Sequence, residues 1–397
     1  MRQTKWMTLI VAVAACGILA GCDTQAQNKQ AAVERWEKSS AAAKVTTVEN
    51  LIERGQIADA QKTLQKCLEA DPDLAAAHFQ MGRVHLIENR NAEARSSFER
   101  AIELDGSLDT AWFHLGVLFS LDGDNEQALN AYQKAMDLKP AGTEYIVAIA
   151  ELYMNTERTD QARELLEDKL RRQPRNRELL VCMAELSQRV GELDKSAGYY
   201  EQAMVVNAKD QQVLEALGYC YAARKDWVSA TRTFERLLNL VTEDSRKETV
   251  LETLALCAFN AGRYGQALSC YDKLSVMRRD DAEVWLNMAQ AALGADLAGR
   301  ADYAARKALQ LKPSWEEAYA VLGSAQYLQS DFEGALTSFN HVCDDDQMGA
   351  FAWFMTGRCY ARLGQTANAE SAYQKAGSDG ANSSLLLRFL NEKSDAL

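Results

Sequence analysis

The sequence predicts an all-α fold, a solenoid of about ten two-helix units stacked one after another. Three observations predict it. Small residues recur every 34 residues, a second column that is mostly Gly or Ala lies twelve residues before them, and all four prolines lie twelve residues after a member of the first column. A chain of 397 residues is longer than a single compact core usually organises. An array in which each unit packs only on its neighbours accommodates that length.

The first column marks the second helix of each unit, because two helices approach closely only where a side chain is small. Its steps are 34 residues, except for one step of 37. Its members are Ala60, Ala94, Ala128, Ala162, Ser196, Ala230, Ala267, Ala301, Ala335 and Ala369. The residues four positions later, large in every unit but one, are Leu64, Phe98, Tyr132, Leu166, Tyr200, Phe234, Tyr271, Ala305, Phe339 and Tyr373.

The second column marks the first helix of each unit. Its members are Val48, Gly82, Gly116, Ala150, Ala184, Gly218, Ala255, Ala289, Gly323 and Gly357. The pattern predicts units that begin near residues 41, 75, 109, 143, 177, 211, 248, 282, 316 and 350. The step of 37 places a three-residue insertion near residues 241–247, which either lets the array bend or lengthens one helix.

Helix-breaking residues agree with these boundaries. Each proline follows an expected second helix, where a missing backbone N–H does least harm. Five glycines mark the turn between the two helices of a unit: Gly55, Gly123, Gly191, Gly262 and Gly364.

These residues resemble the tetratricopeptide repeat. The segment Ala111-Trp112-Phe113-His114-Leu115-Gly116, followed by Ala128 to Tyr132 and then Pro140, is similar to the family pattern. The resemblance covers about residues 41–380 and is weakest in the first unit, where Lys44 and Val48 replace the usual residues. It implies a right-handed superhelical solenoid whose first helices line a concave groove that binds a protein partner.

The groove residues follow from the repeat positions on the first helices. The expected set is Phe79, Arg83, Phe113, Val117, Val147, Glu151, Val181, Glu185, Glu215, Tyr219, Glu252, Leu256, Leu286, Gln290, Ala320, Ser324, Phe354 and Arg358. The two ends are apolar with one Arg each, and the middle is acidic. Such a groove suits an extended peptide or a partner helix. The alternative is that each Glu only solvates an exposed face.

The N-terminus resembles that of a bacterial lipoprotein precursor. Arg2 and Lys5 precede an apolar run over residues 7–20, which is short for a spanning helix, and the string Leu19-Ala20-Gly21-Cys22 resembles a lipobox. The resemblance implies that residues 1–21 are a signal peptide and that Cys22 is acylated, which anchors the chain to a membrane. An ordinary cleaved secretory signal with a chance Cys is the alternative.

The regions beside the array have their own expected roles. Residues 22–40 are polar and rich in Ala and Gln, which indicates an anchor and tether that runs toward the first helix. Asp23 favours the inner membrane, facing the periplasm, although the outer membrane is an alternative. Residues 381–397 include an apolar stretch over 385–390 that is expected to cap the last unit.

The cysteines and histidines are expected to have structural roles. Seven cysteines remain after Cys16 and Cys22, and most lie in core columns, with a Cys257–Cys270 disulfide as an alternative. His78 and His85 lie seven residues apart on one expected helix, so core packing is favoured over a metal site. No catalytic or nucleotide-binding motif is present, so no enzyme activity and no cofactor are expected.

Charge and anchor together set the expected function. The net charge of −12 gives no electrostatic footprint for nucleic acid. The sequence predicts an envelope scaffold or adaptor that grips one component of a secretion, pilus, polysaccharide-export or cell-wall complex. A regulatory subunit of an envelope enzyme and a chaperone for exported proteins are the alternatives.

Overall fold

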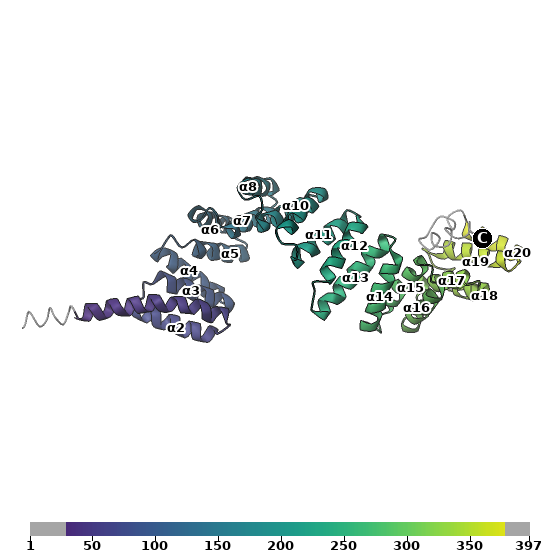
Figure 1. Cartoon of the computed structure of the whole chain (residues 1–397), viewed down its shortest axis with the longest axis horizontal. Helices are drawn as coiled ribbons and strands as arrows, with labels where there is room; N and C mark the ends of the chain where they lie inside the picture. Colours follow the sequence, from purple (N-terminus) through teal and green to yellow (C-terminus); the bar gives the residue numbers. More distant parts are fainter. Residues whose placement is uncertain (1–28, 378–397) are drawn as a thin grey trace, which may run out of the picture. The chain divides into compact units, whose positions relative to one another are not determined.

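The computed structural model describes residues 29–377 (Figure 1). The expected signal peptide, Cys22, Asp23 and the expected cap at 381–397 lie outside the described residues. Within residues 29–377 every regular element is a helix, as the all-α prediction requires, and none of these helices is long and apolar enough to cross a membrane.

The described helices follow one another in pairs. A helix over residues 29–53 comes first. It is followed by α2 (Ile57–Ala70), α3 (Ala75–Ile87), α4 (Asn91–Leu104), α5 (Asp109–Leu121), α6 (Asn125–Leu138), α7 (Thr143–Asn155), α8 (Thr159–Arg172), α9 (Arg177–Arg189), α10 (Leu193–Val206), α11 (Gln211–Ala223), α12 (Trp227–Leu238), α13 (Asp244–Asn260), α14 (Tyr264–Met277), α15 (Ala282–Gly294), α16 (Ala298–Leu311), α17 (Glu316–Leu328), α18 (Phe332–Asn340), α19 (Gly349–Arg362) and α20 (Thr366–Ala376). Helix 29–53 and the odd-numbered helices are called A helices below, and the even-numbered ones B helices.

The two columns of small residues lie where the A and B helices of a repeat meet. A Cβ added at Gly82 would lie 2.6 Å from the ring of Phe98, and one added at Gly116 would lie 2.6 Å from the ring of Tyr132. Gly218, Gly323 and Gly357 face their aromatic partners in the same way. The prediction that small residues let the helices approach is confirmed, and the missing side chain leaves the room that the ring fills.

The turn inside each repeat places one residue in the left-handed region. Five of these residues are the predicted glycines, with φ between +71° and +80°. The other five are Asn89, Glu157, Lys225, Asp296 and Ser330, with φ between +59° and +72°. All ten lie five residues before a member of the first column, which confirms ten repeats within the described residues.

The insertion lengthens one helix. Helix α13 has 17 residues, whereas α11 and α15 have 13 each. The additional turn at its start carries Arg246, which reaches back to α11.

The chain divides into two compact units, Met1–Pro174 and Arg175–Leu397, called unit 1 and unit 2. In unit 1 the weakest predicted repeat is present: Val45, Val48 and Ile52 pack on Leu64 and Cys67 of α2. Residues 29–40 of the expected tether are helical and continue into this A helix, and most of them are exposed.

Candidate protein-binding surfaces

The expected groove residues of unit 1 lie on α3, α5 and α7. Phe79, Arg83, Phe113, Val117 and Val147 are half-buried, whereas Glu151 is exposed. Desolvation by the groups around its carboxyl raises the pKa of Glu151 above its ordinary value.

Phe79 and Phe113 belong to a cluster of aromatic rings in unit 1. The ring of His114 stacks on Phe98 with centroids 5.3 Å apart, and Phe79 lies 5.8 Å from both rings. Phe113 lies 5.6 Å from Tyr132 and 5.3 Å from Tyr145. Phe79 and Phe113 therefore contribute to packing between helices, whether or not they also contact a partner.

His114 is held neutral inside this cluster. Burial, and to a lesser degree the charge of Arg83, lowers the pKa of His114 to about 4. Arg83 itself donates to Gln80 at 3.0 Å, and Gln80 donates to Glu49 at 2.9 Å, which joins α3 to the preceding A helix.

The expected groove residues of unit 2 lie on α9, α11, α13, α15, α17 and α19. Val181, Glu215, Phe354 and Arg358 are half-buried, and Glu185 and Glu252 are exposed. The guanidinium of Arg358 lies 5.0 Å from the centre of the Tyr327 ring.

Two of the acidic groove residues of unit 2 form ion pairs, one with the next A helix and one with the end of the B helix of its own repeat. Arg246 of α13 contacts Glu215 at 3.0 Å, and Arg278 contacts Glu252 at 2.9 Å. Arg278 also contacts Glu248. The expected acidic band is therefore partly neutralised here. The Arg246–Glu215 pair connects neighbouring repeats, whereas the Arg278 pairs join α13 to the end of α14 within one repeat.

Two apolar residues beside these ion pairs stay open to solvent. Tyr219 of α11 is 44% exposed and Leu256 of α13 is 54% exposed, and they occupy the same repeat position. By contrast, Leu286, Ala320 and Ser324 are buried, so their expected role as groove-lining residues is wrong. The small side chains at 320 and 324 suit close packing around α17 rather than a partner.

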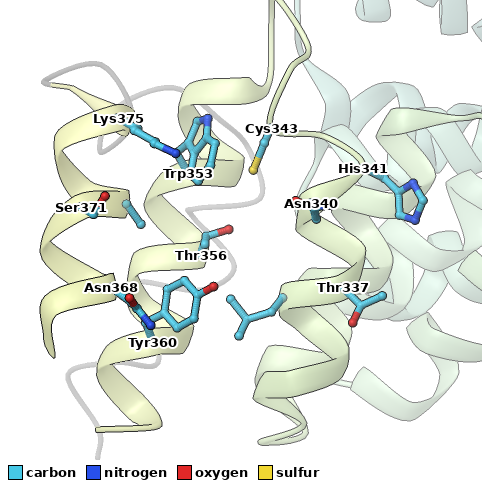
Figure 2. Close-up of a pocket in the computed structure, with 12 residues that line it drawn as sticks. Thr337, Asn340, His341, Cys343, Trp353, Thr356, Tyr360, Asn368, Ser371 and Lys375 are labelled. Carbon is cyan, nitrogen blue, oxygen red and sulfur yellow. The ribbon is translucent and has the colours of Figure 1, made fainter. Parts of the chain in front are cut away.

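The described pockets of unit 2 include hollows that the sequence analysis missed, between successive B helices. One, of about 530 Å³, lies among α18, α19 and α20 (Figure 2). Figure 2 shows Thr356 and Tyr360 of α19 directed into the space that α18 borders on its other side. The Nζ atom of Lys375 lies 4.0 Å from the centre of the Trp353 ring at this pocket.

Two further hollows lie on either side of α12. One of about 360 Å³ is bordered by α10, α11 and α12, and one of about 510 Å³ by α12, α13 and α14. Both are lined by Arg232 and Arg236. The repeat pattern could have predicted these hollows, because each lies between two successive B helices and is bordered by the A helix between them.

The seven described cysteines are buried free thiols. Cys257 and Cys270 are among them, so the alternative of a disulfide between these two residues is wrong. Burial raises the pKa of Cys257 to about 11 and that of Cys359 to about 12. Thiols with raised pKa values are unreactive at neutral pH.

The two histidines considered as metal ligands contact protein groups. The Nε2 atom of His78 lies 2.9 Å from the carbonyl oxygen of Pro72, and Nδ1 of His85 lies 3.3 Å from the hydroxyl of Ser97. Residues 29–377 contain no group of three or more His, Cys, Asp or Glu side chains that could hold a metal ion.

Comparison with solved structures finds similar helical-repeat proteins. Pseudomonas aeruginosa PilF is 19% identical, with a TM-score of 0.45 over 54% of this chain and 97% of that one. MamA is 18% identical, with a TM-score of 0.38 over 47% of this chain and 94% of that one. The tetratricopeptide domain of P58(IPK) is 16% identical, with a TM-score of 0.28 over 82% of this chain and 99% of that one. No curated protein matches the chain.

Family models give the assignment. Models described as the tetratricopeptide repeat match residues 46–109, 80–143, 121–181, 213–248 and 321–383, which together span more than half of the chain. Within residues 29–377 the matched segments lie on the helices of the array, and the chain belongs to the tetratricopeptide repeat proteins, a family of protein-binding scaffolds.

Proposed function

We propose that this protein is an adaptor of the bacterial cell envelope, held at a membrane by acyl chains on Cys22, that binds a protein partner through its A helices. It would gather a component of a secretion, pilus, polysaccharide-export or cell-wall complex. The inner membrane, facing the periplasm, is the proposed location because Asp23 follows Cys22.

The observation that carries the binding proposal is the exposure of Tyr219 and Leu256 on neighbouring A helices. Large apolar side chains at adjacent repeat positions, beside ion pairs that already satisfy the nearby charges, form a surface that gains from being covered. An aromatic anchor next to an aliphatic one is the kind of contact that dominates protein interfaces.

The lipobox supports the anchor, and one substitution tests it. Full-length protein expressed in a Gram-negative host should incorporate a palmitate analogue and sediment with membranes. Cys22→Ser should lose both properties, because the thioether-linked lipid cannot form. Wild-type protein that carries no label and remains in the supernatant would contradict the anchor.

Crosslinked pull-down from detergent-solubilised membranes tests the partner surface. Wild-type chain should recover a specific protein, and Tyr219→Ala with Leu256→Ala should recover far less of it. Val228→Ala with Val276→Ala is the matched control, since these valines are 43% and 64% exposed elsewhere in unit 2. Equal recovery by both double variants would remove Tyr219 and Leu256 from the binding site.

A third variant tests the acidic residues. Glu151→Lys, Glu185→Lys and Glu215→Lys together reverse three expected groove charges, one in unit 1 and two in unit 2. Loss of the same partner would assign these side chains to binding. Unchanged recovery would leave Glu151 and Glu185 without a role in binding, and Glu215 as the ion-pair partner of Arg246 alone.

A further inference from the structure

Two arginines of α12, Arg232 and Arg236, lack the ion pairs that six other arginines of unit 2 form. Arginines that form ion pairs in this unit are Arg177, Arg224, Arg246, Arg278, Arg300 and Arg306. Arg232 and Arg236 form no ion pair with any described residue, although the chain carries 56 acidic residues. Arg236 donates only to the carbonyl oxygen of Ala208, at 3.3 Å.

The two guanidinium groups lie on one face of α12, four residues apart. Like charges at this spacing repel each other, and an anion bound between them would remove the repulsion. Both side chains are exposed, and both line the hollows on either side of the helix. Lys273 of α14 adds a third cation to the larger hollow.

The carboxylates in these hollows have other partners. Glu201 accepts a hydrogen bond from the hydroxyl of Tyr221, and Glu235 accepts one from the side-chain amide of Gln266. Neither forms an ion pair with Arg232 or Arg236. The arginine donors therefore stay available for carboxylates from outside, which they can bind with two parallel hydrogen bonds.

An apolar residue completes the surface. Val205, which lines the smaller hollow, is 82% exposed. Thr233 and Ser229 on one side of α12, and Gln266 and Ser269 beyond it, offer neutral hydrogen-bonding groups. The surface thus combines two arginines that form no ion pair, an exposed valine and polar side chains around two hollows.

We propose that the B-helix surface around α12 binds an acidic segment of a partner protein, with two Asp or Glu side chains on Arg232 and Arg236 and an apolar side chain on Val205. This inference rests on the proposed adaptor function and adds a second contact, on the face opposite the expected groove. A protein segment suits the site better than an anionic bilayer. The net charge of −12 and the carboxylates of Glu201 and Glu235 repel a continuous anionic surface, whereas discrete carboxylates fit between them.

Selection from a random peptide library displayed on phage tests the proposal with the full-length chain in detergent. Peptides recovered by the wild type should be enriched in two Asp or Glu residues near an apolar residue. Synthetic copies should bind Arg232→Glu with Arg236→Glu about a hundredfold more weakly, because two charge-assisted contacts are lost. Their affinity should also fall as the salt concentration rises.

The matched control reverses two charges outside the hollows. Lys209→Glu with Lys225→Glu makes the same change of net charge on exposed residues. The turn conformation at 225 tolerates Glu, since Glu157 occupies the equivalent position. Both double variants should keep the wild-type circular dichroism spectrum and melting temperature, and only the arginine variant should lose the peptides.

Three outcomes would overturn the proposal: no peptide is selected, the selected peptides lack acidic enrichment, or both double variants bind them equally. A fourth outcome would also overturn it. If the Cys22→Ser chain floats with phosphatidylglycerol vesicles, and this binding is lost when Arg232 and Arg236 are replaced by Glu, the ligand of the surface is a lipid. If this test fails but the membrane pull-down still recovers a partner, only the proposed second contact around α12 is wrong. Failure of the pull-down itself would remove the adaptor function.

Discussion

One repeat position is filled in opposite ways in α3 and α5 of unit 1 and in α11 and α13 of unit 2. In unit 1 it is Phe79 and Phe113, whose rings pack within 6 Å of other aromatic rings. In unit 2 the same position is Glu215 and Glu252, which form ion pairs at 3.0 and 2.9 Å with Arg246 and Arg278. The same position thus joins neighbouring helices through aromatic packing in α3 and α5 and through charge in α11 and α13.

This difference bears on stability and on binding. Burying a phenylalanine contributes a few kcal/mol, whereas an exposed ion pair contributes about 0–1 kcal/mol. Unit 1 uses its expected groove residues mainly for its own packing. Unit 2 satisfies its charges pairwise and leaves Tyr219 and Leu256 open, which is why we place the partner surface there.

Alanine substitution at this shared position gives the largest expected contrast. Phe113→Ala should lower the free energy of unfolding by about 3 kcal/mol, since it removes the contacts with Tyr132 and Tyr145. Glu215→Ala should lower it by no more than about 1 kcal/mol. Urea denaturation followed by circular dichroism measures both. Equal losses would show that the two units are not stabilised differently.

Acid should act on unit 1 through His114. Its pKa of about 4 in the folded chain lies below the ordinary 6.5, so the unfolded chain binds the proton more readily. His114 therefore leaves stability intact above pH 6.5 and lowers it as the pH falls from 6.5 toward 4, by about 3 kcal/mol at pH 4. Stability measured against pH for wild type and His114→Phe isolates this contribution. Identical acid limbs would contradict a buried neutral imidazole.

The ion pairs of unit 2 should respond to salt. Arg278→Ala removes the contacts with Glu248 and Glu252 and should lower stability by about 1 kcal/mol in low salt, with a smaller loss at high ionic strength. Arg232→Ala removes no ion pair and should change stability by less than about 0.5 kcal/mol. A salt-independent loss for Arg278→Ala would point to packing of its alkyl chain instead.

The turn inside each repeat is a position where the units should behave alike. Glu157 in unit 1 and Lys225 in unit 2 both adopt positive φ, at 61° and 59°. Glycine there relieves strain, so Glu157→Gly and Lys225→Gly should each raise stability by up to about 1 kcal/mol. Gly191→Ala should lower it by a similar amount. Thermal melting curves compare the three variants, and a loss on either Gly substitution would show that the side chain makes a stabilising contact.

The sequence predicted the repeats well because their packing demands particular residues. At Gly82 and Gly116 a Cβ would lie 2.6 Å from the ring of Phe98 or Tyr132, so a larger residue there would displace the ring. Half of the turns were missed because ordinary residues such as Asn89 and Asp296 adopt the left-handed conformation there. Their spacing of five residues before the first column was the signal that could have found them.

The side chains of the candidate site were harder to predict. Ala320 and Ser324 share repeat positions with groove residues but are buried, and only their small size hinted at this. The pairing of Glu215 depends on Arg246, which comes from the additional turn of α13. In the sequence, the arginines of α12 that form no ion pair could not be distinguished from arginines that do, because pairing depends on which side chains neighbouring helices bring close.

Site-specific photocrosslinking tests the central claim, that this array holds a protein partner, most directly. A benzophenone amino acid would replace Tyr219, Val205 or, as a control, Val276 in the full-length chain in living cells. The account predicts that one envelope protein is captured from positions 219 and 205 and not from 276. Capture of no protein from 219 and 205, or equal capture from 276, would contradict it.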